Sequence, residues 1–108
     1  MTARFLALYD APADPEAFDR HYDEIHIPLI RQLPGLRRYS VGRNVAALHG
    51  LPCYLITELE WETMEELRAA FGSPEGQATA TDAAHLQELA AVRRMIFTAE
   101  DCPRVTPR

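Results

Sequence analysis

The side chains best suited to acid/base chemistry lie in one short stretch, which contains His21, Tyr22, Asp23, Glu24 and His26. A neutral imidazole near pH 7 can accept or donate a proton, which suits isomerisation, enolisation or lactone chemistry. With ~100° per residue, His26 lies about 80° from the centre of the apolar face of the predicted helix, on a flank near a cavity rim. His26 is therefore our candidate catalytic acid/base. The alternative is a partly exposed histidine that only packs and hydrogen-bonds at a helix bend.

Pro28 follows this histidine by two positions. Proline has no backbone N–H, so inside a helix it frees the carbonyl four residues back, here that of Glu24, at a cost of ~3 kcal/mol. A sequence keeps such a local conflict more readily where it shapes a site. The proline therefore predicts a distorted helix beside His26.

Tyr39 is the second candidate catalytic residue. It lies on the strand predicted after Pro34-Gly35, and its phenol is suited to orienting a carbonyl or an enolate in a dry pocket. The alternative is an aromatic residue of the core. Tyr22 and Trp61 are candidate substrate contacts.

Arginines on the predicted strands offer a further candidate substrate contact, Arg43. A guanidinium can hold a carboxylate or phenolate through two parallel hydrogen bonds. The alternative is that these arginines form ion pairs within the sheet or between subunits, with the glutamates of the third strand. The four arginines considered are Arg38, Arg43, Arg93 and Arg94.

A metal site is not expected at the histidines. His21 and His26 are five residues apart, which puts their rings about 140° apart on an α-helix, so they do not converge as an i, i+4 pair would. Asp23 and Glu24 are expected to face solvent. The sequence has no Ser-His-Asp order, phosphate-binding loop or dinucleotide motif, so no nucleotide or flavin cofactor is expected.

Glu58 and Glu60 share one face of the third predicted strand. If that face lined a cavity, a buried carboxylate there could act as a base. The opposite face carries Leu55, Leu59 and Trp61 and is the better core. The two glutamates are therefore expected at a solvated or rim position.

Periodicity and cap residues predict the elements that must position these side chains. Asp14 caps a helix that Pro34 ends, and Thr63 opens another with a capping box. Asp82 is expected to cap a last, short helix. The expected strands span residues 4–10, 36–47, 53–61 and 92–99, and the expected helices span 15–33, 64–72, a short one after 73 and another after 82. The buried stripe of the first helix is expected to be Phe18, Tyr22, Ile25, Leu29 and Leu33.

The resulting order, β-α-β-β-α-β, is that of the α+β ferredoxin-like fold, an antiparallel sheet with helices on one face. The first strand is nevertheless apolar on both faces, with Phe5 on one and Leu6 and Leu8 on the other. A second copy of the same sheet is the simplest cover for the open face. The sequence predicts a single domain, 1–108, with an irregular tail from about 101, in a homodimeric α/β barrel around a cavity.

Length and charge limit the possible partners. The chain has 108 residues, which is the size of one domain. Its 16 Asp+Glu against 11 Lys+Arg give a net charge of −5, which argues against nucleic acid or an anionic membrane. No apolar run approaches the ~18–20 residues of a membrane span. Two cysteines are too few for a disulfide framework, so a cytoplasmic protein with reduced thiols is expected.

Several motifs, in order, resemble the EthD family of small bacterial dimeric α/β-barrel proteins, named from gene clusters for ethyl tert-butyl ether degradation. The similarity covers about residues 4–100. It implies catabolism or tailoring of a small organic compound, and isomerase relatives in the wider group place a catalytic histidine at the position of His26. Cys53 does not align with the cysteine of those isomerases. The motifs are the run 18–29 with His26, Pro28 and Leu29, then Pro34-Gly35-Leu36, Tyr39, Ser73-Pro74-Glu75-Gly76 and Asp82.

Two hypotheses of function follow, together with a bland alternative. The first is a cofactor-free enzyme of isomerase, lyase or monooxygenase type that binds a small apolar or aromatic oxygenated compound, with His26 as acid/base and Tyr39 as orienting donor. The second is a non-catalytic accessory protein that carries a hydrophobic ligand. The bland alternative is that the space under the first helix is only a packed core.

Overall fold

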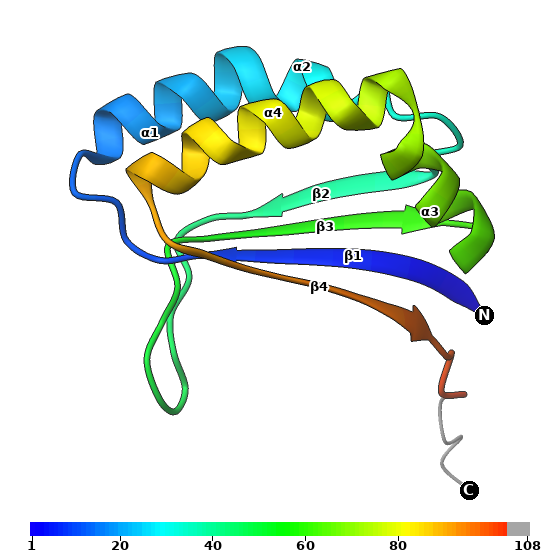
Figure 1. Ribbon diagram of the computed structural model, residues 1–108. Helices are drawn as coiled ribbons and strands as arrows, with labels where there is room; N and C mark the ends of the chain where they lie inside the picture. Colours follow the sequence, from blue (N-terminus) through cyan, green and yellow to red (C-terminus); the bar gives the residue numbers. More distant parts are fainter. Residues whose placement is uncertain (104–108) are drawn as a thin grey trace, which may run out of the picture.

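The computed structural model describes residues 1–103, and the predicted tail beyond Pro103 lies outside the described residues. Four strands form one antiparallel sheet in the order β2-β3-β1-β4. The helices lie together on one face of this sheet (Figure 1). This is the predicted α+β ferredoxin-like fold. The elements are β1 (Thr2–Tyr9), α1 (Pro15–His21), the π-helical turn η1 (Tyr22–His26), α2 (Ile27–Ile30), β2 (Arg38–Gly42), β3 (Leu55–Trp61), α3 (Met64–Gly72), α4 (Pro74–Leu89) and β4 (Val92–Ala99).

The helices bury the sheet face that presents Ala7 and Tyr9 of β1 and Leu59 and Trp61 of β3. Small residues on β1 let the helices approach closely, while the large side chains of β3 fill the space beside them. Two clusters form the core. One consists of Ala3, Ile30, Leu33, Leu59, Trp61, Leu67 and Ala70, and the other of Ala7, Tyr9, Phe18, Tyr22, Leu55, Leu86 and Ala90.

No helix covers the opposite sheet face (Figure 1). Side-chain alternation puts Leu6, Met95 and Phe97 on this open face, and the last two are 42% and 38% exposed. The predicted pattern of apolar residues on both faces of the sheet is thus confirmed.

The charged part of the open face is an ion-pair cluster. Nη1 of Arg4 lies 2.9 Å from Oε1 of Glu58, and Nη2 lies 3.2 Å from Oε1 of Glu60. Both glutamates lie on the face opposite the helices, but only Glu58 is solvated as expected, because Glu60 is 8% exposed. Their partner is an arginine of the first strand rather than one of the four strand arginines considered from the sequence.

The first helical region is not one continuous α-helix. In η1 the backbone N–H of Ile27 donates to the carbonyl of Tyr22, five residues back. Pro28 explains this turn, because it supplies no N–H for the α-helical bond to Glu24. The distortion predicted beside His26 is confirmed.

The extra residue in this turn shifts the buried stripe by one position. Ile25, predicted to be buried, is 46% exposed, whereas His26 and Ile30 are only 4% and 3% exposed. The predicted stripe was therefore wrong at Ile25 but right at Leu33, which is 4% exposed, and the predicted rim position of the histidine was wrong. The π-turn rotates His26 into the interior.

α4 is a single helix rather than two short ones. Ser73 caps its start, with Oγ accepting a hydrogen bond from the N–H of Gly76 at 3.1 Å. The predicted cap role of Asp82 is wrong, because this residue lies mid-helix and is 7% exposed. α4 is the longest helix, and no helix in residues 1–103 is both long and apolar enough to cross a bilayer.

The second predicted strand is shorter than expected and ends at Gly42. The loop that follows, 43–54, extends away from the helices (Figure 1). Asn44 and Gly50 adopt positive φ angles of 55° and 79°, which turn the backbone at both ends of the loop. Leu48 and Leu51 in this loop are almost fully exposed.

Candidate functional site

His26 closes the π-turn with its ring inside the protein. The ring centroid lies 5.3 Å from that of Tyr22, and Nδ1 lies 2.9 Å from Oδ2 of Asp82. A carboxylate only accepts hydrogen bonds, so Nδ1 holds the proton and donates it. Among residues 1–103 Nε2 has no hydrogen-bond partner. Its lone pair is therefore available to take a proton.

Asp82 also binds a second imidazole. Nε2 of His21 lies 2.7 Å from Oδ1 of the carboxylate, and this ring is 28% exposed against 5% for His26. The expectation that the two rings diverge is thus wrong. In a π-turn the backbone bond spans five residues, so positions 21 and 26 come to the same side of the helix.

Burial lowers the pKa of His26 below its ordinary value of 6.5, because the interior disfavours the charged imidazolium. The hydrogen bond that Nδ1 donates to Asp82 and the negative charge of this carboxylate act in the opposite direction, and each effect is smaller. The ring is therefore neutral at pH 7. A neutral imidazole in this position can act as a base. When it takes up a proton, the carboxylate of Asp82 stabilises the imidazolium that forms.

Three hydroxyl groups form a chain beside this histidine. Oη of Tyr22 lies 2.5 Å from Oγ1 of Thr57 and 2.8 Å from Oη of Tyr39. Burial raises the pKa of both phenols. They remain protonated at neutral pH, so they can donate hydrogen bonds but do not act as bases.

The other two candidate substrate contacts lie elsewhere. Arg43 is exposed where the 43–54 loop begins, and its Nη2 lies 2.6 Å from Oδ1 of Asp23. Trp61 is fully buried in the other core cluster, and its Nε1 donates to the carbonyl of Pro34 at 2.8 Å. Of the predicted site residues, the structure brings together only the histidine and the two tyrosines.

The sequence analysis missed the role of Asp82. Thr79, Asp82 and Leu86 are spaced by three and four residues, and all three are buried. This spacing is that of one helix face, so a continuous helix from Ser73 would have predicted an inward-facing carboxylate. The assumption of a helix boundary at position 82 concealed this signal.

The interior around the histidine is packed with rings. Tyr9, Phe18 and Tyr22 contact one another with centroid separations of 5.3–5.9 Å. None of the five surface hollows found among the described residues has His26 in its lining. Within residues 1–103, no group of three histidine, cysteine or acidic side chains is arranged to hold a metal ion.

A family model described as the EthD domain matches residues 10–90. The chain belongs to the EthD family. A relative from Rhodococcus erythropolis, described as an uncharacterized 11.0 kDa protein in the thcB-thcC intergenic region, is 39% identical over 100 residues. The match covers 91% of this chain and 94% of that protein. The family predicted from the motifs around His26 is thus confirmed.

Solved structures agree with this membership. An EthD family protein from Bacillus halodurans is 36% identical, with a TM-score of 0.82 over 93% of this EthD chain and 100% of its own. SnoaB, a cofactor-independent oxygenase from Streptomyces nogalater, has a TM-score of 0.68 at 18% identity over 94% and 95% of the two chains. A dimeric ferredoxin-like protein of unknown function from Thermobifida fusca has a TM-score of 0.69 at 16% identity over 92% of each. At these identities the last two show a shared fold alone.

Proposed function

We propose that this EthD-family protein performs cofactor-free acid/base chemistry on a small oxygenated organic compound, with Nε2 of His26 as the base. One observation carries the proposal: His26 is buried, and its other nitrogen is committed to Asp82. Only one ring atom is then available for a substrate proton. Such a fixed tautomer is what a general base requires.

The reaction would begin with transfer of an acidic C–H or O–H proton from the substrate to Nε2. The imidazolium that forms donates from Nδ1 to Asp82, which stabilises its charge. The substrate anion can then react in two ways. It can take the same proton back at another carbon, which is an isomerisation, or it can react with dioxygen, a chemistry that the structural relative SnoaB makes relevant as a cofactor-independent oxygenase.

Tyr39 would orient the oxygen of the substrate. Its phenol stays protonated because burial raises its pKa, and it is linked through Tyr22 to the histidine side of the core. A neutral phenol donates a hydrogen bond to a developing enolate or phenolate. Tyr22 would act as a positioning residue, since its hydroxyl already bonds Thr57 and Tyr39.

We also propose a homodimer formed through the open sheet face. Two observations support it: apolar side chains on a face without helices, and a structural relative described as a dimeric ferredoxin-like protein.

Deuterium exchange tests the base without knowledge of the natural substrate. The protein is incubated in D2O with 2-tetralone and α-angelica lactone, and loss of the acidic C–H signal is followed by proton NMR. The wild type is expected to accelerate exchange, and His26→Gln is expected to lose ~10²-fold or more of that rate. His85→Gln, on the exposed surface of α4, serves as the matched control. No acceleration by the wild type on either compound would count against the proposal.

A second candidate function is non-catalytic binding of a hydrophobic ligand. The packed rings around His26 favour it, because a substrate could reach the base only after these side chains move. Binding without exchange in the NMR assay would support this candidate.

A further inference from the structure

An apolar groove lies between α3 and the edge of the sheet formed by β1 and β4. Its volume is about 310 Å³, at the lower end of the ~300–1,000 Å³ typical of small-molecule sites. Phe5 and Ile96, which are register partners, provide its floor. The lining residues are Phe5, Leu67, Arg68, Phe71 and Ile96.

Aromatic rings make one wall of this groove suitable for a flat ligand. The centroids of Phe5 and Phe71 are 5.1 Å apart, and Phe71 is backed by Trp61 at 5.5 Å. These contacts with the core hold the two phenylalanines in place. The wall is therefore formed before any ligand arrives.

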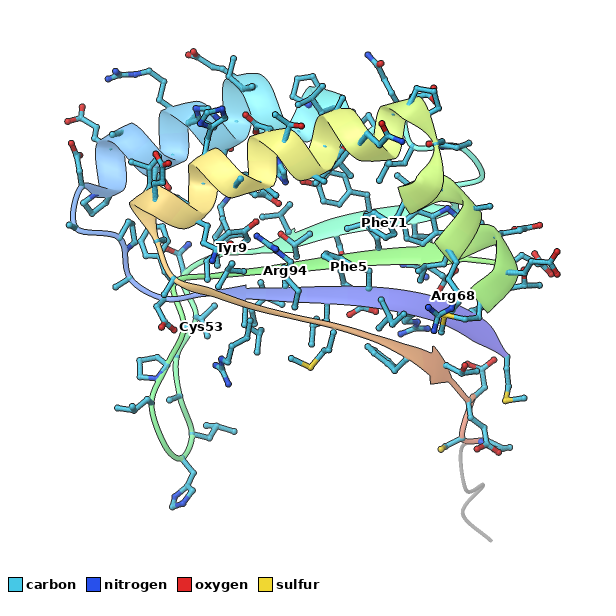
Figure 2. The ribbon with its side chains drawn as sticks, in the orientation of Figure 1. Phe5, Tyr9, Cys53, Arg68, Phe71 and Arg94 are labelled. Atoms are coloured by element: carbon cyan, nitrogen blue, oxygen red, sulfur yellow. The ribbon has the colours of Figure 1, made fainter. Side chains whose placement is uncertain are left out.

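One arginine lines this groove and a second lies just outside it, and neither has a carboxylate partner within residues 1–103. Arg68 is part of the lining. Arg94 lies two residues before Ile96 on the same face of β4, so the backbone positions of Arg94 and Ile96 are ~6.7 Å apart. Figure 2 shows Arg94, Phe5 and Phe71 in the layer between the helices and the sheet. Neither guanidinium forms an ion pair within residues 1–103, although three other arginines do.

Arg94 lies outside the groove lining, one same-face position beyond Ile96 on β4, on the side of the candidate base. Its backbone pairs with Ala7, and its Nη2 donates to Oε1 of Gln87 on α4 at 3.3 Å. Both oxygens of Asp82 bond imidazoles, and Asp82 forms no ion pair with Arg94 within the described residues. The positive charge of Arg94 also lowers the pKa of His26, which is consistent with their proximity.

We propose that the groove binds an aromatic or apolar molecule bearing a carboxylate or phenolate, with the anion at Arg94 and the apolar body on Phe5, Phe71 and Ile96. The inference rests on the proposed function in that it names the substrate class. An anion is favoured because neither Arg94 nor Arg68 has a carboxylate partner within the described residues, so both positive charges can interact with a bound anion. This orientation brings the acidic end of the ligand toward His26.

The test compares two probes with the same ring system, 2-naphthoate and the neutral 2-acetylnaphthalene. Affinities are measured by isothermal titration calorimetry. The wild type is expected to bind the anion at least tenfold more tightly, and Arg94→Gln is expected to lose this preference. Arg93→Gln is the matched control, because Arg93 is the adjacent exposed arginine on the opposite sheet face. Equal binding of both probes by the wild type would overturn the proposal. Loss of the preference in Arg68→Gln rather than in Arg94→Gln would overturn the orientation.

A second pair of variants tests the apolar half. Ile96→Ala is expected to weaken both probes by the same several-fold factor, whereas Ile25→Ala, outside the groove lining, is expected to change neither. These two side chains are 38% and 46% exposed, so both variants are expected to fold. Equal effects of the two variants would remove the groove from the binding site.

A negative result in the binding test and a negative result in the exchange test refute different proposals. Naphthoate bound through Arg94 by a wild type that accelerates no exchange would leave the groove assignment standing and refute catalysis. Exchange that depends on His26, together with no preference for the anion, would refute the groove and leave the base.

Discussion

His26 can serve as a base only while its ring is neutral, and two features of its surroundings act on that state in opposite directions. Burial favours the neutral ring, and the carboxylate of Asp82 favours the charged one. Burial is the larger effect. The same balance makes the stability of the fold depend on pH.

We expect the free energy of unfolding to fall as pH drops below about 6.5. The pKa of His26 is lower in the folded chain than its ordinary 6.5, so between the two pKa values the unfolded chain binds more protons. Well above pH 6.5 the ring is neutral in both states and the contribution is fully present. Urea denaturation at each pH should show a smaller fall in His26→Gln than in the wild type, with His85→Gln as control. An unchanged slope in His26→Gln would contradict the lowered pKa.

Tyr22→Phe should destabilise the protein by about 1–3 kcal/mol, because the hydroxyl of the buried Thr57 loses its partner. Tyr54→Phe is the control, since its hydroxyl bonds only the half-buried Asp19 and its loss should cost less. Both free energies of unfolding can be measured in urea. Equal values would show that the hydroxyl chain contributes nothing beyond a surface hydrogen bond.

Of the two residues at the centre of the candidate site, only His26 was predicted from the sequence. His26 could be singled out because Pro28 and the family motifs lie beside it. The inward position of Asp82 could have been predicted from its spacing to Thr79 and Leu86. Its pairing with His26 could not, because that contact joins residues 56 positions apart and depends on how α4 docks.

Among the elements, the π-turn decides which residue of the first helical region faces the core. An α-helical wheel places Ile25 toward the core. Because the π-turn contains one additional residue, His26 faces the core instead and Ile25 is exposed. Pro28 predicted a distorted helix. It did not predict that the distortion takes the form of a wider π-helical turn rather than a kink. Predicted caps were right at Asp14 and Thr63, which accept the expected hydrogen bonds, and wrong at Asp82, because α4 begins at Ser73 instead.

Gly76 lies where α4 packs closely against the end of α3, and a side chain at this position would clash. A methyl group there would meet the carbonyl oxygens of Ala70 and Phe71, the latter at 2.5 Å, where α4 begins against the end of α3. We expect Gly76→Ala to lower the free energy of unfolding by about 1–3 kcal/mol. Gly72→Ala, with no atom within 4 Å, should be neutral or stabilise by up to ~1 kcal/mol. Thermal and urea denaturation of the pair would decide, and equal stability would contradict the close approach.

For the molecule as a whole, the sheet with one bare face is the feature that the sequence predicted best. The succession of elements along the chain and the alternation within each strand followed from hydrophobic patterning, because each strand repeats it over several residues. The end of β2 at Gly42 was missed, although Asn44, which adopts a positive φ of 55°, is a residue type that favours turns. Its early end depends on β3, which pairs with β2 only as far as Ile56.

A charge on the bare face tests the proposed dimer. Leu6 lies on β1 between its register partners Glu58 and Met95. We expect the wild type to be a dimer by size-exclusion chromatography with light scattering. Leu6→Glu should dissociate it and lower its unfolding midpoint, because a buried carboxylate without a partner is costly. Ala84→Glu on the exposed side of α4 should do neither. A monomeric wild type would refute the dimer.

The two imidazoles and the carboxylate that joins them come from distant parts of the chain. Asp82 follows His26 by 56 residues and His21 by 61, so each hydrogen bond closes a loop of more than half the polypeptide. Closing such loops requires that the intervening strands have already assembled. No fragment ending before α4 can contain this arrangement, and during synthesis it can form only after most of the chain has been made.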